Sequence, residues 1–277
     1  MENRLHVVHV GKNKYCNNPV VVGDTEYRLY YRSTHAMLED CAEIIADMEK
    51  GWADPDMAML TLASFLWIVE HKDTDTANSK LAGIKSLSTC CLDNKFCLFR
   101  MQDSNSICSH CYAATQQERQ HGLTDHNIIN GVILRNVLFP VSVLVTLPLW
   151  NEKFFRIESF GDVENVTQAR NYIRLAKAFP FTSFAAWTKN YNVWKKAFEE
   201  EGGKPENLSF IISSCYVNVE ADIPEGLQGV VNHVFTVYEK GENVSINCGG
   251  RKCMECLKAH KNCYFTDTEK DIRETLK

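Results

Sequence analysis

The second half of the chain alternates between strand-like and helix-like segments, and this alternation restricts the fold more than any other feature. Runs rich in apolar and β-branched residues occur at 154–160, 182–187, 208–213 and 230–238. Between the first three runs, apolar residues recur at helical spacing at 165–179 and 191–201. Strands separated by helices of about 10 to 15 residues are typical of βαβ units. The sequence therefore predicts an α/β fold, either a partial (β/α) barrel or an open parallel sheet with helices.

The rest of the chain predicts a different local organisation. Strand-like runs at 6–10 and 20–31 predict a small N-terminal hairpin, and helical spacing after Ser33 predicts a helix that ends at Gly51. The polar stretch 71–112 predicts a long loop that a bound metal would order. The charged segment 267–277 predicts a solvated helix or a frayed end. We expect three segments: a hairpin and helical region at 1–96, a cysteine loop and βα core at 97–240, and a Cys-rich metal module with a charged tail at 241–277.

Seven of the twelve cysteines form two tight groups. Group one consists of Cys97, Cys108 and Cys111, and group two consists of Cys248, Cys253, Cys256 and Cys263. Two thiolates separated by two residues can hold one metal ion or one edge of a cluster from a single turn, whereas disulfides usually join cysteines farther apart. Both groups therefore predict metal ligation.

Group one offers three thiolates on a loop that leads into a helix. Three thiolates leave one iron of a 4Fe-4S cluster without a protein ligand, and this iron could bind a small molecule. Zinc with a fourth ligand, such as His110 or His121, fits the spacing equally well. Cys90 or Cys91 could replace Cys97 in this group.

Group two offers four thiolates within sixteen residues. Such a set can complete a closed structural site that holds either zinc or a 4Fe-4S cluster. The pair Gly249-Gly250 would let the backbone wrap closely around the metal. The spacing does not distinguish iron from zinc, since thiolates accept both.

Polar residues follow the predicted strands, where ligands of parallel α/β sheets bind. Ser159, Gly161 and Asp162 follow the first of these strands and Lys189 follows the second, which makes them candidate cofactor or substrate contacts. Turn chemistry and helix capping explain the same residue types equally well.

Composition and charge restrict the partners. The net charge of −5 argues against a nucleic-acid surface along the whole chain, although Arg251, Lys252, Lys258, His260 and Lys261 form a local basic patch beside group two. The first residues lack the apolar core of a secretory signal, so we expect a cytoplasmic chain with reduced thiols. The apolar stretch 132–150 is interrupted by Arg135 and two prolines, so we expect a buried segment and no membrane partner.

Three short motifs carry a resemblance. The element Cys108-Ser-His-Cys111-Tyr112-Ala113, the turn Glu-Ser-Phe-Gly161-Asp162 and the strand end Trp187-Thr188-Lys189-Asn190, together with the late cysteines, resemble the phage gene-product-88 family. Members of such families are similar to radical S-adenosylmethionine proteins. The resemblance implies a partial (β/α) barrel, a 4Fe-4S cluster on group one and an auxiliary cluster on group two. It also implies that Gly161 and Asp162 contact the methionyl amine.

Two functions follow from these observations. The first is a phage iron-sulfur enzyme of the radical type, with S-adenosylmethionine as cofactor, Ser159 and Asp162 as cofactor contacts and Lys189 as a substrate contact. The second is a non-enzymatic, metal-stabilised phage protein that acts on a host macromolecule or nucleic acid. The ten residues between Cys97 and Cys108 depart from the Cys-x3-Cys-x2-Cys spacing of radical enzymes and keep the second function open.

Overall fold

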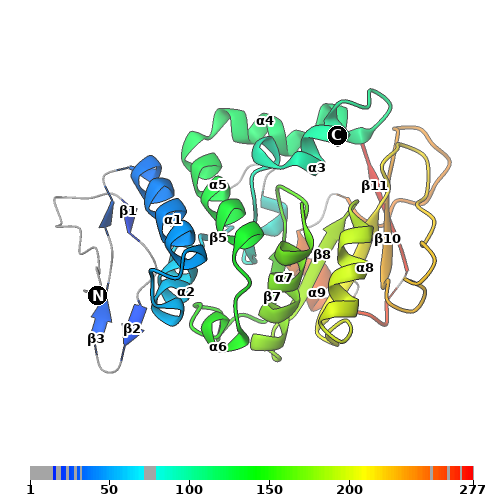
Figure 1. The fold of residues 1–277 in the computed structure, drawn as a ribbon. Helices are drawn as coiled ribbons and strands as arrows, with labels where there is room; N and C mark the ends of the chain where they lie inside the picture. Colours follow the sequence, from blue (N-terminus) through cyan, green and yellow to red (C-terminus); the bar gives the residue numbers. More distant parts are fainter. Residues whose placement is uncertain are drawn as a thin grey trace.

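The computed structural model describes residues 33–71, 79–249, 252–260, 263–268 and 270–276, together with four short strands between residues 15 and 31. Its centre is a seven-stranded sheet with the order β11-β10-β9-β8-β7-β6-β5 (Figure 1). The strands are β5 (Ile68–Glu70), β6 (Lys85–Leu87), β7 (Phe154–Ile157), β8 (Ser183–Thr188), β9 (Leu208–Ser213), β10 (His233–Tyr238) and β11 (Asp271–Thr275). Strands β6 to β11 are parallel and adjacent in chain order, whereas β5 pairs antiparallel with β6. The prediction of an α/β fold with an open, mostly parallel sheet is confirmed.

The sheet is covered on both faces. All six residues of β9 are buried, as expected for a parallel strand between two layers. In β7, Phe155 and Ile157 belong to the large hydrophobic core on one face, whereas Phe154 packs against a smaller cluster on the other. We call the face of Phe155 the outer face and the face of Phe154 the inner face.

Four helices between residues 121 and 200 cover the outer face, in front of the sheet in Figure 1. They are α5 (His121–Asn136), α6 (Val141–Leu144), α7 (Val166–Ala178) and α8 (Tyr191–Glu200). Asn165 caps α7 by accepting the N–H of Gln168 at 2.9 Å. Tyr172 of α7 and Trp194 of α8 are fully buried and stack with ring centroids 6.3 Å apart, which joins the two helices over the sheet.

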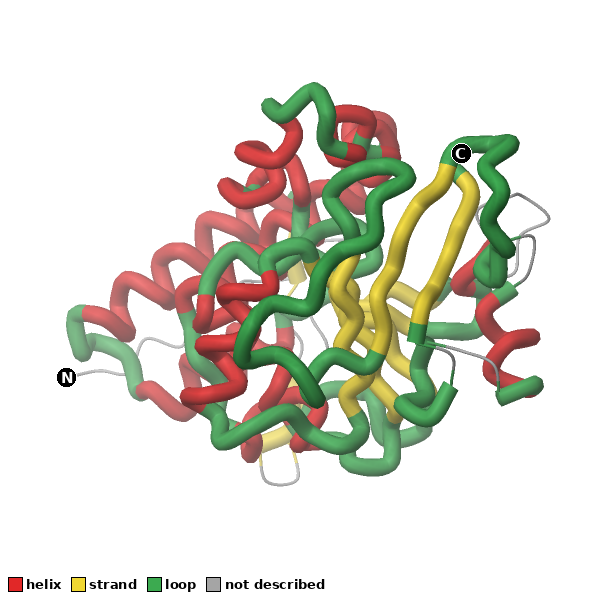
Figure 2. Tube along the Cα trace, turned by 90° about the vertical axis from the view of Figure 1, so that its right-hand side faces the viewer, coloured by secondary structure: helices red, strands yellow, loops and turns green. Residues whose placement is uncertain are grey.

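One short helix, α9 (Cys253–Lys258), lies on the inner face, behind the sheet in Figure 1 and beside it in Figure 2. Leu257 of α9 and Tyr264 pack there against Ile84, Ala185, Ile211 and Ile272. The C-terminal segment thus forms the second layer that closes the inner face.

The N-terminal part adds helices and short strands at one side of the sheet (Figure 1). Ser33 and Asp54 cap α1 (Thr34–Glu49) and α2 (Pro55–Ser64), so the predicted helix that ends near Gly51 is confirmed. The short strands are β1 (Tyr15–Cys16), β2 (Val20–Val22), β3 (Thr25–Tyr27) and β4 (Tyr30–Tyr31). β2 pairs antiparallel with β3 within the strand-like run 20–31, and the other run of the predicted hairpin, 6–10, lies outside the described residues.

The stretch 71–112, predicted as a long loop, contains regular structure. It includes η1 (Ser79–Leu81), strand β6, η2 (Cys91–Asp93), α3 (Lys95–Met101) and η3 (Ile107–His110), and α4 (Tyr112–Arg119) follows. The prediction was wrong because β6, the first parallel strand, is only three residues long and shows no resolvable periodicity. The sheet therefore draws strands from all three segments expected from the sequence.

The C-terminal segment was also predicted incorrectly. Residues 271–275 form β11, which pairs in parallel with β10, instead of a solvated helix or a frayed end. Ile272 is buried in the inner cluster while the charged residues around it remain partly exposed. A strand with one apolar residue between charged neighbours shows too little alternation in its sequence to be distinguished from a polar tail.

The apolar stretch 132–150 lies in the core, as predicted. Its residues Ile133, Leu134, Phe139, Leu144 and Leu149 are all at most 1% exposed. Among the described residues, no helix combines the length and the apolar character needed to cross a membrane.

Candidate functional site

Group one sits on the connection that follows β6 and crosses the carboxyl ends of the parallel strands. A buried carboxylate holds the start of this connection: Glu158 accepts the N–H and the hydroxyl of Thr89, each at 2.9 Å. Asn94 then caps α3 by accepting the N–H of Cys97 at 2.9 Å, and its amide donates to the carbonyl of Asp162 at 2.7 Å. One side chain therefore fixes both Cys97 and the turn after β7.

The second half of the connection is tied to the end of β9. Ser106 caps η3 by accepting the N–H of Cys108 at 3.2 Å, and its hydroxyl donates to the carbonyl of Cys215 at 3.2 Å. The N–H of Ile107 donates to the same carbonyl at 2.9 Å. Cys111 stands at the N-terminal end of α4. The connection thus spans the sheet edge from β6 to β9 and carries the three thiols with it.

The thiols of group one interact with one another. Electrostatic interactions link Cys97 to Cys108 and Cys111, and Cys111 also interacts with Cys91. The interaction with Cys91 lowers the pKa of the Cys111 thiol to about 6 and raises the pKa of Cys91, whose burial acts in the same direction. Burial raises the pKa of Cys97. The three thiols of group one and Cys91 therefore lie within electrostatic range of one another.

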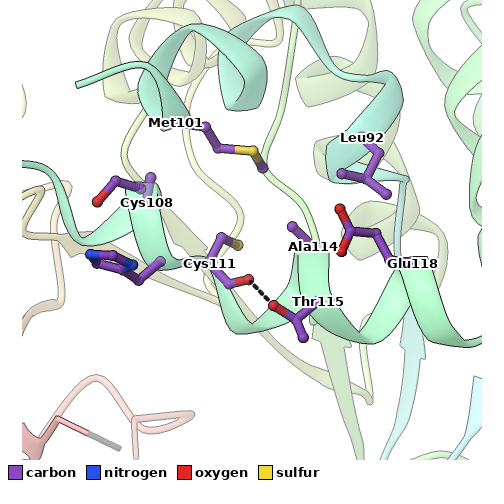
Figure 3. Close-up of a pocket in the computed structure, with 9 residues that line it drawn as sticks. Leu92, Met101, Cys108, Cys111, Ala114, Thr115 and Glu118 are labelled. Carbon is purple, nitrogen blue, oxygen red and sulfur yellow. Dashed lines mark hydrogen bonds between the residues drawn. The ribbon is translucent and has the colours of Figure 1, made fainter. Parts of the chain in front are cut away.

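A pocket of about 370 Å³ opens beside these thiols (Figure 3). Cys108, His110 and Cys111 line this pocket together with Leu92 and Met101 of α3. The volume lies within the range of small-molecule sites, about 300 to 1,000 Å³. The pocket gives a ligand access to two thiols of group one and to His110, which sequence analysis named as an alternative zinc ligand.

The predicted contacts after β7 and β8 lie at the same edge of the sheet. The carboxylate of Asp162 accepts three hydrogen bonds, from Val163 N–H at 2.8 Å, Thr188 hydroxyl at 2.6 Å and Lys189 N–H at 2.7 Å. Burial raises the pKa of Asp162 against these bonds. Burial of Lys189 disfavours its charge, but Cys108, Asp162, Cys215 and Cys111 together raise its pKa.

Ser159 and Gly161 occupy the turn itself. The hydroxyl of Ser159 is hydrogen-bonded to Ser88 at 2.8 Å and to Ser86 at 3.2 Å, and the hydroxyl of Tyr112 donates to its carbonyl at 3.2 Å. A Cβ at Gly161 would lie 2.8 Å from Glu158 Oε2, so the turn needs glycine for packing. Both residues therefore join β6, β7 and α4 at the edge.

Group two lies apart from group one, on the inner face. Cys248, Cys253 and Cys263 pack against the inner hydrophobic cluster, and electrostatic interactions link them to one another and to Cys256. Burial raises the pKa of Cys253 to about 11. Lys80 donates to Cys248 Sγ at 3.3 Å and to Glu274 at 2.7 Å. The four thiols of group two therefore lie within electrostatic range of one another, and Lys80 is bonded to one of them, Cys248.

The arrangement does not establish the metal-binding module expected from the sequence. Among the residues that the structure describes, no three His, Cys, Asp or Glu side chains form a group that could hold a metal ion. Soft thiolates are nevertheless the donors that zinc and iron-sulfur centres prefer. Of the basic patch beside group two, Arg251 and Lys261 lie outside the described residues, and His260 is bonded to Asp267 at 3.0 Å.

Sequence reasoning missed several residues of the site. Cys215 follows β9 and lies within electrostatic range of Cys108 and Lys189, and Gln117 accepts the thiol of Cys91 at 2.8 Å. Glu158 has a φ of 52°, which turns its side chain away from the strand alternation and into the outer core. A polar residue directly after a strand was the only available signal for Cys215.

Comparison with known proteins gives a family but no characterised relative. A model of the protein family described as Gene product 88 matches residues 67–274, well over half of the chain. No curated protein and no solved structure matches the chain. The match falls on the family that the motifs resemble, and the comparisons lend no support to the resemblance to radical S-adenosylmethionine proteins.

Proposed function

This chain belongs to the phage Gene product 88 family, and from its own geometry we propose that it is an iron-sulfur protein that uses S-adenosylmethionine. Group one, Cys97, Cys108 and Cys111, holds a 4Fe-4S cluster in this proposal. The observation that supports it best is that these three thiols lie within electrostatic range of one another, of Asp162 and of Lys189, on the connection that crosses the carboxyl edge of a parallel sheet. This edge is where α/β sheets bind their ligands.

The donor set suits the cluster. Three thiolates hold three irons and leave one open for a ligand, and a thiol with its pKa near 6, such as Cys111, is ready to ligate at neutral pH. A 4Fe-4S cluster with an open iron supplies an electron for the reductive cleavage of a bound sulfonium.

The residues around group one have separate roles in the proposal. Lys189 holds positive charge beside the thiolates and balances part of their negative charge. Ser159, Gly161 and Asp162 form the wall of the turn after β7, which lies against the cofactor in this proposal. The side chains of Ser159 and Asp162 are hydrogen-bonded within the chain and hold this wall in place. Tyr112, held against the carbonyl of Ser159, links the cysteine helix to this wall.

Group two has a structural role in the proposal. Cys248, Cys253, Cys256 and Cys263 hold a second centre, zinc or 4Fe-4S, which fastens α9 to the inner face. Lys80, bonded to Cys248 and Glu274, offsets part of the charge of four thiolates. The packing of three of these cysteines against the inner cluster supports this role, since metal-binding energy then adds to folding energy.

Metal analysis of cysteine variants tests the proposal. The full chain is purified without oxygen, and iron, sulfide and zinc are measured for wild type, C97A, C108A, C111A and C256A. C41A is the matched control because Cys41 is buried in the outer core between helices. We expect each group-one variant to lose one cluster while C41A and C256A keep it. A group-one variant with wild-type iron would contradict the ligand assignment.

Spectroscopy separates the enzyme from a cluster with another role. The reduced wild-type protein is examined by electron paramagnetic resonance before and after S-adenosylmethionine is added. We expect the cluster signal to change on addition, because the sulfonium compound binds at the open iron. The iron content of C91A identifies the third ligand. If C91A loses the cluster and C97A keeps it, Cys91 takes the place of Cys97.

One observation favours a second candidate function, a metal-stabilised phage protein that binds a host macromolecule or nucleic acid without catalysis. The carboxylate of Asp162 is saturated by three bonds from its own chain, which leaves it a poor contact for a cofactor amine. Zinc without iron in both groups, and no response to S-adenosylmethionine, would establish this second candidate in place of the first.

A further inference from the structure

Arg156 projects from β7 onto the inner face of the sheet. Its neighbours Phe155 and Ile157 are buried in the outer core, and Phe154, which shares its parity, packs against the inner cluster. Arg156 is paired in register with Ser86 of β6 and Ala185 of β8. The guanidinium therefore lies over the middle strands, near their carboxyl ends.

Trp187 of β8 holds this guanidinium in place. The Arg156 Cζ atom lies 3.2 Å from the centroid of the Trp187 ring, a close cation–π stack. The Nε–H donates to the carbonyl of Glu158 at 3.4 Å. Stacking occupies one face of the planar group but leaves the edge with its terminal N–H donors for another partner.

Among the residues that the structure describes, no Asp or Glu forms an ion pair with Arg156. Glu274 of β11, a strand of the same sheet, is bonded to Lys80 at 2.7 Å. A half-buried cation without a carboxylate partner is the usual feature of a site for an anion.

Neutral hydrogen-bonding groups surround the cation. His71 is hydrogen-bonded to Ser86 at 2.8 Å, and Ser86 continues to Ser159 at 3.2 Å. Burial and the charge of Arg156 lower the pKa of His71, so its imidazole is neutral at pH 7. Hydroxyls and a neutral imidazole can share an oxyanion with a guanidinium without repelling it.

We propose that Arg156, stacked on Trp187, binds an oxyanion of the substrate, a carboxylate or a phosphate, on the inner face between the two cysteine groups. Arg156 lies within electrostatic range of Tyr112, which follows Cys111, and of Cys253 and Cys263 of group two. The proposal deepens the proposed function and rests on it only in naming the anion as part of a substrate. The binding site itself stands on the geometry of Arg156 and Trp187.

Binding of simple anions tests the site. The full chain is purified without oxygen and titrated with inorganic phosphate, followed by calorimetry and by phosphorus line broadening. A separate titration with acetate is followed by calorimetry. We expect R156Q to weaken the preferred anion roughly tenfold, the loss of one charge-assisted contact. R156K should recover part of the affinity because lysine keeps the charge but not the fork. R119Q removes an exposed arginine of α4 and is the control for net charge.

The outcomes separate this proposal from the proposed function. If phosphate and acetate both fail to bind wild type, or bind R156Q and R119Q equally, the oxyanion site is wrong and Arg156 serves only as a counter-charge to Cys253 and Cys263. If S-adenosylmethionine displaces the anion from wild type, the site belongs to the cofactor and its assignment to the substrate is wrong. A protein without iron that still binds the anion through Arg156 would keep this site while the iron-sulfur proposal fails.

Discussion

The carboxylate of Asp162 accepts the backbone N–H of Lys189 at 2.7 Å, and this contact joins the turn after β7 to the end of β8. The hydroxyl of Thr188 adds a second bond to the same carboxylate at 2.6 Å. Because Asn94 also holds the carbonyl of Asp162, the contact connects the group-one loop to two strand ends. Asp162 therefore acts as a clamp of the candidate site.

Removal of this clamp should destabilise the fold. In D162A, the buried donors of Val163, Thr188 and Lys189 lose their acceptor, and we expect the free energy of unfolding to fall by about 3 kcal/mol. Chemical denaturation measures the loss. D222A removes an exposed carboxylate and should stay within about 0.5 kcal/mol of wild type. If D162A is as stable as wild type, the carboxylate is not a clamp. Asp162 is then again a candidate cofactor contact.

Gly161 should tolerate no side chain. A methyl group at this position would lie 2.8 Å from Glu158 Oε2 and 2.9 Å from both the carbonyl and the hydroxyl oxygen of Thr89. We expect G161A to lose about 1 to 3 kcal/mol of stability through overpacking, measured by thermal unfolding. G122A is the matched control: the site in helix α5 has open space, so alanine there should stabilise by up to about 1 kcal/mol. Equal melting of the two variants would contradict the close packing at Gly161.

Glu158 should make stability depend on pH. Burial raises its pKa to about 7, although Tyr172 and Thr89 donate hydrogen bonds to it. The folded protein thus binds the proton more tightly than the unfolded chain. Its contribution is complete below the unfolded value of 4.5 and is lost as the pH rises through 7, by up to about 3 kcal/mol.

Denaturant titrations from pH 4 to pH 8 measure this effect. E158Q cannot ionise, so the difference in stability between wild type and E158Q should change over the same interval. A constant difference across that interval would show that Glu158 keeps one protonation state throughout.

The sequence predicted the middle of the sheet because β7, β8 and β9 carry continuous apolar residues between helices of clear periodicity. It did not predict β6 and β11, for different reasons. β6 has three residues, too few for a pattern, and β11 has one buried residue, Ile272, between charged neighbours. In both strands, pairing with a neighbour decides the structure, and a local pattern cannot report it.

The candidate site shows the same division. The spacing of Cys108 and Cys111 could be recognised because both thiols belong to one turn. Cys91 was named only as a possible replacement for Cys97, and Cys215 could not be assigned, since both reach group one through the fold: one follows β6 and the other follows β9. Asp162 was recognised as a polar residue at a strand end, but its three hydrogen-bond partners, which decide its role, depend on the parallel pairing of β7 with β8.

The reactivity of Cys111 should report its interaction with Cys91. That interaction lowers the pKa of Cys111 to about 6, so in the metal-free protein Cys111 should be mostly thiolate at pH 7. We expect alkylation by iodoacetamide, followed by mass spectrometry, to show a rate for Cys111 with a midpoint near pH 6. C91A removes the interaction and should move the midpoint toward the ordinary thiol value of about 8.5. Cys215, whose pKa is raised by burial, is the internal control and should react only at higher pH in both proteins. An unchanged midpoint for Cys111 in C91A would show that the two thiols do not interact, and would remove Cys91 from the candidate ligands.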